Sequence, residues 1–219
     1  MRVEPAGTQD AIRALRAAAA AGPYFAVAVG PDPAPGWRPA GDLYADPAVL
    51  AAVVERVRRR LATPERRVAA SIFFQGWAAR LWSVALGVLL HSGRVPVLTT
   101  LRWRDEGGTV YLGVDTPELA AGDLAGVVIG QHLEPLAAAV RRGGPVADRV
   151  LWGNAASALR GAARVLDGAA PGPASAAADR VLAAGPLRGE LDADGWRRSC
   201  CLYYRVPRGG VCGDCVLAR

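Results

Sequence analysis

The sequence predicts a mainly α fold of the α+β class, with a helical core, one small β-hairpin and an irregular C-terminal segment. Three observations predict it. Apolar residues recur every three or four positions over residues 46–90 and 145–167, which is the period of a buried helix face. Two short β-prone runs flank a turn at residues 105–108. All four cysteines lie in the last twenty residues, among prolines and glycines that favour loops.

The chain has 219 residues, which is enough for one domain with a small appendage. We expect a helical domain over residues 1–185. We expect residues 186–219 to form a cysteine-containing segment that packs on this domain, so that the two make one globular unit.

The N-terminal part of the chain predicts three helices. An alanine-rich helix is expected over residues 8–21, followed by a strand or extended segment at 24–29. The next helix begins after Asp46, a good N-cap, with Pro47 at the first helical position. Thr63 and Pro64 repeat this start signal and predict a third helix that runs to about residue 90.

The apolar stretch at residues 68–90 is long enough to cross a membrane. However, Gln75, Arg80 and Ser83 lie near its middle, and an arginine at the centre of a span costs about 2.5–3.5 kcal/mol. We therefore favour a central core helix over a membrane span. A buried arginine needs a partner, so we expect a structural salt bridge at Arg80 in preference to contact with an anionic ligand.

The second half of the chain predicts one hairpin and more helices. The hairpin has strands at residues 98–104 and 109–114, joined by a four-residue turn at 105–108. Helices are expected over residues 129–142, 145–167 and 175–184, with a linker at 168–173.

The protein is basic, with a net charge of +6, and all 26 of its basic residues are arginine. The arginines are scattered along helix ends and polar faces instead of forming one stripe, so we expect no nucleic-acid partner. The N-terminus has no signal-peptide pattern, which favours a reducing, cytoplasmic setting.

The four cysteines are Cys200, Cys201, Cys212 and Cys215, in the pattern C-C-x10-C-x2-C. Such a cluster in a reducing compartment more often binds metal than forms disulfides. Structural zinc favours two C-x2-4-C pairs, and the adjacent pair at 200 and 201 does not suit a single ion. A two-iron cluster has a wider footprint and accepts four thiolates at irregular spacing, so we favour [2Fe-2S] over zinc, with two disulfides third.

The cysteine pattern at the C-terminus resembles that of the FhuF family of ferric-siderophore reductases, and residues 74–82 (FQGWAARLW) and 151–157 (LWGNAAS) also resemble family landmarks. The resemblance implies a [2Fe-2S] cluster on Cys200, Cys201, Cys212 and Cys215. It also implies a cytoplasmic oxidoreductase that reduces a ferric siderophore, of hydroxamate type by resemblance, by one-electron transfer and releases Fe(II).

The electron source is expected to be another protein. The chain has no GxGxxG motif and, without any lysine, no ordinary Walker motif, so it is not expected to bind a nicotinamide or flavin. No membrane span is expected, while peripheral association with a membrane is left open.

Weaker candidates surround the cluster. Arg205, Arg208, Trp196 and His132 are candidate substrate-binding residues, although His132 better suits a surface or capping role. Together with Arg197 and Arg198, the first two arginines are expected to offset the negative charge of the cluster, and the amides of Gly209, Gly210 and Gly213 are expected to approach its sulfurs. No role is assigned to Trp152 or Asn154.

Two other functions compete with reduction of siderophores. A structural zinc module with four cysteines would suit the basic charge, and a [2Fe-2S] redox sensor would suit the cysteines. Either would bind a protein or nucleic-acid partner. The sensor would need an element that reads DNA, and the sequence has no helix-turn-helix pattern.

Overall fold

A computed structural model describes residues 6–31 and 34–218. Its seven α-helices are α1 (Ala6–Ala19), α2 (Gly41–Ala45), α3 (Pro47–Arg60), α4 (Arg66–Ser92), α5 (Glu134–Arg142), α6 (Asp148–Asp167) and α7 (Pro173–Leu182). The strands are β1 (Ala28–Val29), β2 (Arg38–Pro39), β3 (Val95–Pro96), β4 (Arg102–Glu106), β5 (Thr109–Val114) and β6 (Leu119–Ala120). The predicted mainly α fold with few strands is confirmed.

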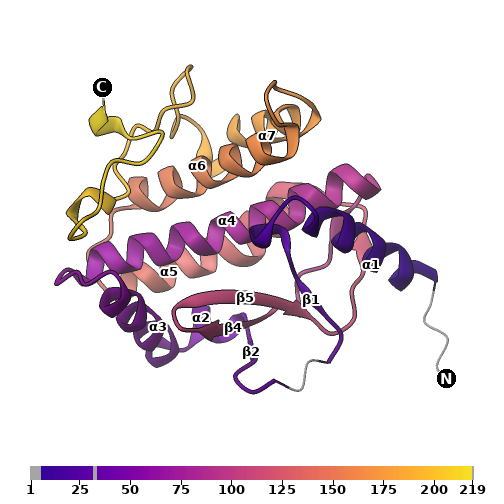
Figure 1. Ribbon diagram of the computed structural model, residues 1–219, viewed down its shortest axis with the longest axis horizontal. Helices are drawn as coiled ribbons and strands as arrows, with labels where there is room; N and C mark the ends of the chain where they lie inside the picture. Colours follow the sequence, from indigo (N-terminus) through magenta and orange to yellow (C-terminus); the bar gives the residue numbers. More distant parts are fainter. Residues whose placement is uncertain (1–5, 32–33, 219) are drawn as a thin grey trace.

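Helix α4 is the centre of the molecule. Figure 1 shows α6 and α7 on one side of it and α5, α3 and the sheet on the other, with α1 crossing near its C-terminal end. Phe74, Trp77 and Trp82 on α4 are at most 1% exposed, and they anchor the hydrophobic core. By length and composition α4 could cross a membrane, but 67% of its most apolar window is buried against the rest of the protein. In this structure it is the core helix that the sequence predicts.

The start of α3 follows the predicted cap. Asp46 accepts a hydrogen bond through Oδ1 from the amide of Ala48 at 2.8 Å, and Pro47 is the first helical residue. Helix α4 begins at Arg66, slightly after the predicted start, because Glu65 is still in an extended conformation.

The predicted hairpin is formed by β4 and β5, with Trp103 opposite Leu112. Its turn has two residues, and the four-residue turn predicted from the sequence is wrong. Gly107 and Gly108 both have positive φ, at 59° and 83°, which allows a tight turn that leaves Asp105 and Glu106 in the strand. The two-residue strands β1 and β2 extend the hairpin to a sheet of order β1-β5-β4-β2, and β3 pairs with β6.

The remaining helices bring the C-terminal segment to α4 and α6. Helix α6 begins at Asp148, three residues after the predicted start at Pro145, because Ala147 is extended. It is followed by a loop in which the Asp167 carboxylate accepts bonds from the amides of Gly172, Ala174 and Ser175. These contacts hold α7 beside α6. The chain then leaves α7 and crosses the surface of α6 as the irregular segment at one end of the molecule (Figure 1).

Helix α5 is preceded by η2 (Gly126–Leu133), a stretch of π-helix. The sequence predicts one helix from residue 129, and the structure extends it toward the N-terminus. Such π-helical turns are rare in proteins.

Candidate metal centre

The cysteine segment is fixed to the N-terminal half of α6 by a close approach at Gly153. Ser199 donates a hydrogen bond through Oγ to the carbonyl of Arg149 at 2.6 Å. A Cβ at position 153 would collide with this hydroxyl, so a side chain there would displace Ser199 Oγ from its hydrogen bond to the helix. The residue that precedes Cys200 is therefore held against α6.

A second close approach shapes the turn between the two cysteine pairs. The amide of Gly209 donates to the carbonyl of Val206 at 2.7 Å, and a Cβ at position 209 would lie 2.5 Å from the carbonyl oxygen of Tyr203. This turn reverses the chain after Pro207, as the sequence predicts, and returns Cys212 toward Cys201.

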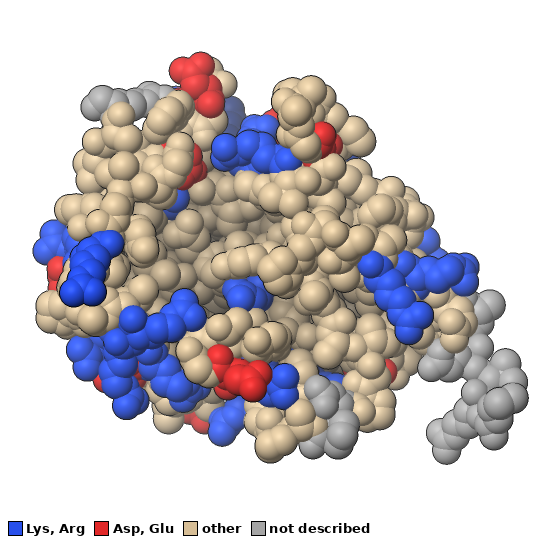
Figure 2. Space-filling model, viewed as in Figure 1, with Lys and Arg blue, Asp and Glu red and all other residues tan. Residues whose placement is uncertain are grey.

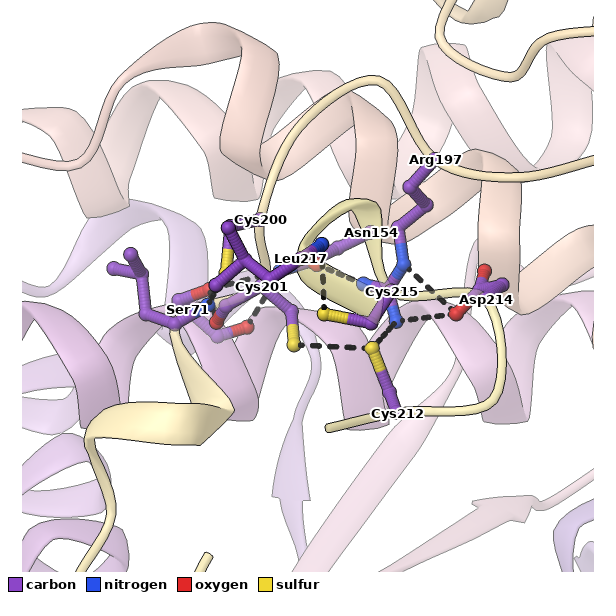
Figure 3. A network of polar contacts seen from close by, with 10 residues as sticks. Ser71, Asn154, Arg197, Cys200, Cys201, Cys212, Asp214, Cys215 and Leu217 are labelled. Atoms are coloured by element: carbon purple, nitrogen blue, oxygen red, sulfur yellow. Dashed lines mark hydrogen bonds and ion pairs between the residues drawn. The ribbon is translucent and has the colours of Figure 1, made fainter. Parts of the chain in front are cut away.

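The structure brings thiols from both cysteine pairs together. The Sγ atoms of Cys201 and Cys212 lie 3.7 Å apart and point toward each other (Figure 3), which is far beyond the length of a disulfide bond. All four cysteines are free; Cys201 and Cys215 are buried, and Cys200 and Cys212 are partly buried.

Backbone amides donate to two of the sulfurs. The amide of Leu202 lies 3.3 Å from Cys200 Sγ, and the amide of Leu217 lies 3.4 Å from Cys215 Sγ. The sequence leads us to expect such donors at Gly209, Gly210 and Gly213. In the described structure the amide donors are the two leucines, because each follows its cysteine by two residues in a tight turn.

Arg197 donates to the thiol of a third cysteine. Its Nη2 lies 3.1 Å from Cys212 Sγ, and the same guanidinium binds Asp214 Oδ1 through Nε and Nη2 at 3.1 and 2.9 Å. Arg197 is only 2% exposed. A cation buried this deeply is stable only with such partners, so the arginine and Asp214 form one unit beside the sulfur.

The Arg197 unit continues into the helices (Figure 3). Arg197 Nη1 donates to Asn154 Oδ1 at 2.7 Å, and Asn154 Nδ2 donates to Ser71 Oγ at 2.9 Å. The Ser71 hydroxyl in turn donates to the carbonyl of Cys201 at 2.8 Å. This buried chain of hydrogen bonds joins α4 and α6 to both halves of the cysteine segment, and we call it the Arg197 network.

Burial affects the acidity of the groups around the sulfurs. It raises the pKa of Cys212 to about 12 and, with the neighbouring Cys201 and Cys215, raises the pKa of Cys200. For Asp214, burial raises the pKa, but the hydrogen bonds from Arg197 outweigh it and the net pKa is lowered. Cys200 and Cys212 therefore keep their protons in the absence of metal, and a metal must displace those protons to bind these two thiols.

The donor set fits an iron–sulfur cluster. Four thiols, two amide donors and a buried guanidinium supply the ligands and the N–H···S bonds that tune such clusters. Among the described residues, no three His, Cys, Asp or Glu side chains lie close enough to hold one metal ion. The adjacent thiols also differ in surroundings, since Cys201 faces Cys212 while Cys200 receives the Leu202 amide.

The weaker candidates lie in different places. Trp196 lines a pocket together with Gly213 and Asp214, the two residues between Cys212 and Cys215. Arg205 binds Glu65 Oε1 through Nε at 2.6 Å, so its charge is already paired. Arg208 is exposed in a turn. Of the four arginines expected to offset the cluster charge, Arg197 is the one whose side chain reaches a sulfur in the described part of the chain.

His132 is a core residue, and the expected surface or capping role is wrong. Its side chain is 3% exposed, and Nδ1 lies 2.8 Å from the hydroxyl of Tyr44. Burial lowers the pKa of His132 to about 4, so the ring is neutral. A role of His132 in substrate binding stays a prediction, and the burial of its side chain argues against that role.

A cavity of about 430 Å³ adjoins the cysteine segment, and we call it the cysteine-loop cavity. It lies between α4, α6 and the turn η1 (Pro23–Phe25), and its walls include Tyr24, Gln75, Ser157, Arg164, Gly213 and Asp214. Gly213 and Asp214 are the two residues between Cys212 and Cys215. A molecule in this cavity thus touches the loop that carries two of the thiols.

Sequence reasoning missed the Arg197 network. Asn154 lies in the motif at residues 151–157 and is the only asparagine of the chain, which was the available signal. Ser71 gave no signal, because a serine within an apolar helix usually bonds its own backbone.

The comparisons with known proteins agree with the cysteine pattern. The FhuF 2Fe-2S C-terminal domain family matches residues 197–217, which begin at Arg197 and include all four cysteines. No curated protein matches the chain. The upstream motifs at residues 74–82 and 151–157 lie outside the matched segment, and their link to the family stays a prediction. This match over residues 197–217 indicates a [2Fe-2S] cluster and agrees with the FhuF-like resemblance predicted from the cysteine pattern.

Proposed function

We propose that this protein is a ferric-siderophore reductase that accepts one electron, passes it to a bound ferric chelate and releases the iron as Fe(II). The observation that carries the proposal is the cysteine-loop cavity, whose wall contains Gly213 and Asp214 from the loop between two cysteines. A chelate in this cavity would lie close to the cluster without a bulky side chain between them at Gly213.

In this proposal Cys200, Cys201, Cys212 and Cys215 hold the cluster. The cluster supplies one-electron redox chemistry at a site that the protein keeps partly buried. Arg197 and the amides of Leu202 and Leu217 stabilise negative charge on the thiolates. The cavity walls hold the chelate in place. Fe(II) binds hard oxygen ligands more weakly than Fe(III), so reduction favours release of the metal.

An external protein is the proposed electron donor, and the proposed location is the cytoplasm. The cysteine segment presents Tyr203, Tyr204, Val211 and Leu217 as exposed large apolar side chains, between 37% and 58% exposed. Exposed apolar side chains of this kind support contact with a partner protein near the cluster. Free thiols suit a reducing compartment.

The test uses purified, cluster-loaded protein under anaerobic conditions. Its visible absorption should bleach on reduction with dithionite. After removal of excess reductant, addition of a ferric siderophore should release one Fe(II) per cluster, measured with a ferrous-specific chromophore. Cys212→Ser and Cys215→Ser serve as controls and should lose both the cluster and the release. Colourless protein with one bound zinc, or a loaded protein that releases no Fe(II), would contradict the proposal.

A further inference from the structure

Arg80 is a half-buried cation without a counterion. It lies in the middle of α4, and the sequence predicts a structural salt bridge there. That prediction is wrong, because among the described residues no carboxylate forms an ion pair with Arg80. Its Nη1 donates to the carbonyl of Gly76 at 3.1 Å, and its guanidinium lies 4.4 Å from the centre of the Tyr24 ring.

The surroundings of Arg80 form a second pocket of about 430 Å³, which we call the arginine pocket. Its wall includes Tyr24, Arg60, Arg80, Gly108, Thr109 and Tyr111, and no Asp or Glu is among its described lining residues. Arg60 donates to the carbonyl of Gly108 at 2.8 Å and is otherwise open to the surface. Both cations of the pocket therefore lack an acidic partner within residues 6–31 and 34–218.

The arginine pocket lies next to the cysteine-loop cavity. Pro23 and Tyr24 line both, and the α4 residues facing them, such as Gln75 and Gly76, are neighbours along the helix. Figure 2 shows this face of the molecule hollowed, with arginine atoms inside the hollow. The arginine pocket is therefore separated from the cavity at the Gly213–Asp214 loop by no more than the shared wall at Pro23 and Tyr24.

The positive charge of the pocket favours an anionic ligand. A guanidinium removed from water without a counterion is unfavourable, and an anion that reaches it regains the lost stabilisation. The exposed rings of Tyr24 and Tyr111 add flat surfaces for an aromatic ligand group. Fe(III) with three singly charged hydroxamates is neutral, whereas Fe(III) with three doubly charged catecholates carries three negative charges.

We propose that Arg80 and Arg60, with Tyr24 and Tyr111, form a substrate subsite that selects negatively charged ferric chelates over neutral ones. The inference rests on the proposed function and sets aside the hydroxamate preference that family resemblance implies. The positive net charge of +6 also attracts such anions toward the protein.

The test measures binding without reduction. Gallium(III) is redox-inert, so the gallium tris-catecholate and the neutral gallium tris-hydroxamate are titrated into the cluster-loaded protein by calorimetry. Wild type should bind the anionic complex at least tenfold more tightly. Arg80→Met should weaken that binding at least tenfold while changing the neutral complex less than twofold. Arg16→Met, on the exposed face of α1 and outside both pockets, should change neither.

A second variant and a salt series test the inference independently, in case Arg80→Met does not fold. Arg60→Met, at an exposed position, should weaken the anionic complex about threefold and leave the neutral one unchanged. Added sodium chloride should weaken only the anionic complex. Equal affinity of wild type for the two complexes, or equal effects of Arg80→Met on both, would overturn the inference. If ferric hydroxamate is then still reduced, the proposed function stands; if neither ferric chelate is reduced, the proposed function fails.

Discussion

Arg197 is the side chain through which the two central helices reach the cysteine thiols. It holds Cys212 Sγ, Asp214 and Asn154 at once, and it is almost fully buried. Its neighbour Arg198 is exposed. Two adjacent arginines that look alike in the sequence thus differ completely in their surroundings.

We expect Arg197→Gln to lower the midpoint potential of the cluster. Reduction adds a negative charge, and the variant removes both a cation and an N–H···S bond that favour the reduced state. It also leaves Asp214 without its counterion. A loss of about 1.5 kcal/mol for a hydrogen bond to a charged group corresponds to about 65 mV for a one-electron couple.

A redox titration followed by electron paramagnetic resonance checks this shift on the cluster-loaded fraction alone. Arg197→Lys keeps the positive charge, so its midpoint potential should lie between those of Arg197→Gln and wild type. Arg198→Gln is the matched control, and its midpoint potential should differ from that of wild type by much less than the potential of Arg197→Gln does. A potential that stays unchanged or rises in Arg197→Gln would contradict the role given to this arginine.

His132 makes stability depend on pH. Burial lowers its pKa to about 4, while in the unfolded chain it has the ordinary value of 6.5. The unfolded state therefore binds the proton first, so stability is complete above pH 6.5 and is lost as the pH falls toward 4. Between pH 7 and pH 5 the loss is about 2 kcal/mol.

Thermal unfolding followed by circular dichroism at several pH values measures this loss. His132→Gln changes a buried side chain, so the variant should be less stable than wild type at pH 7. Because glutamine cannot titrate, the stability of the variant should change less between pH 7 and pH 5 than that of wild type. Parallel profiles for the two proteins would show that another group carries the pH dependence.

At the scale of elements, the position of the cysteine segment depends on one face of α6. Gly153 provides the space in which Ser199 lies against the helix, and a Cβ there would collide with its hydroxyl. Overpacking of this kind costs about 1–3 kcal/mol. We expect Gly153→Ala to displace the segment and to reduce the iron and sulfide bound per protein molecule.

Gly161→Ala, on the same helix, is the control for this change. No atom lies within 4 Å of a Cβ built there, so this variant should keep its full cluster content. It should also gain slightly in stability, because alanine is the better helix former. Full iron content in Gly153→Ala would mean that the segment does not depend on this close approach.

The sequence allowed good prediction of single elements. The cap at Asp46, the apolar periodicity of α3 and α4 and the glycines of the hairpin turn are local signals, and the structure has the corresponding elements. Strand β1 lies at the end of the segment predicted as strand or extended at residues 24–29, whereas the two-residue strand β2 was not predicted, because it exists only through pairing with the distant hairpin.

Contacts between distant residues were harder to predict. The cysteine spacing indicates the cluster, since its ligands are close in sequence. The bond between Ser71 and Cys201 spans 130 positions, and no local pattern encodes it. The surroundings of Arg80 were equally hard to predict. The sequence indicates that a buried arginine needs a counterion, but it does not show whether the fold supplies one.

At the scale of the whole molecule, α4 joins the two features on which the proposed function depends. Its N-terminal half holds the cysteine segment through Ser71, and its middle forms one wall of the cysteine-loop cavity and of the arginine pocket. The cluster and the proposed chelate site are thereby built on one rigid helix. In the proposed function, this arrangement would place the cluster and the ferric chelate close to each other without any movement of domains.

The most direct test of the central claim is a single-turnover stopped-flow experiment. Anaerobic protein with a reduced cluster is mixed with increasing concentrations of a ferric siderophore, and the return of the oxidised visible absorption is recorded. The claim predicts that the rate rises and then saturates, because the electron is transferred within a complex in which the chelate occupies the cavity. No return of the oxidised absorption, or a rate that rises linearly with chelate concentration without saturation, would contradict it.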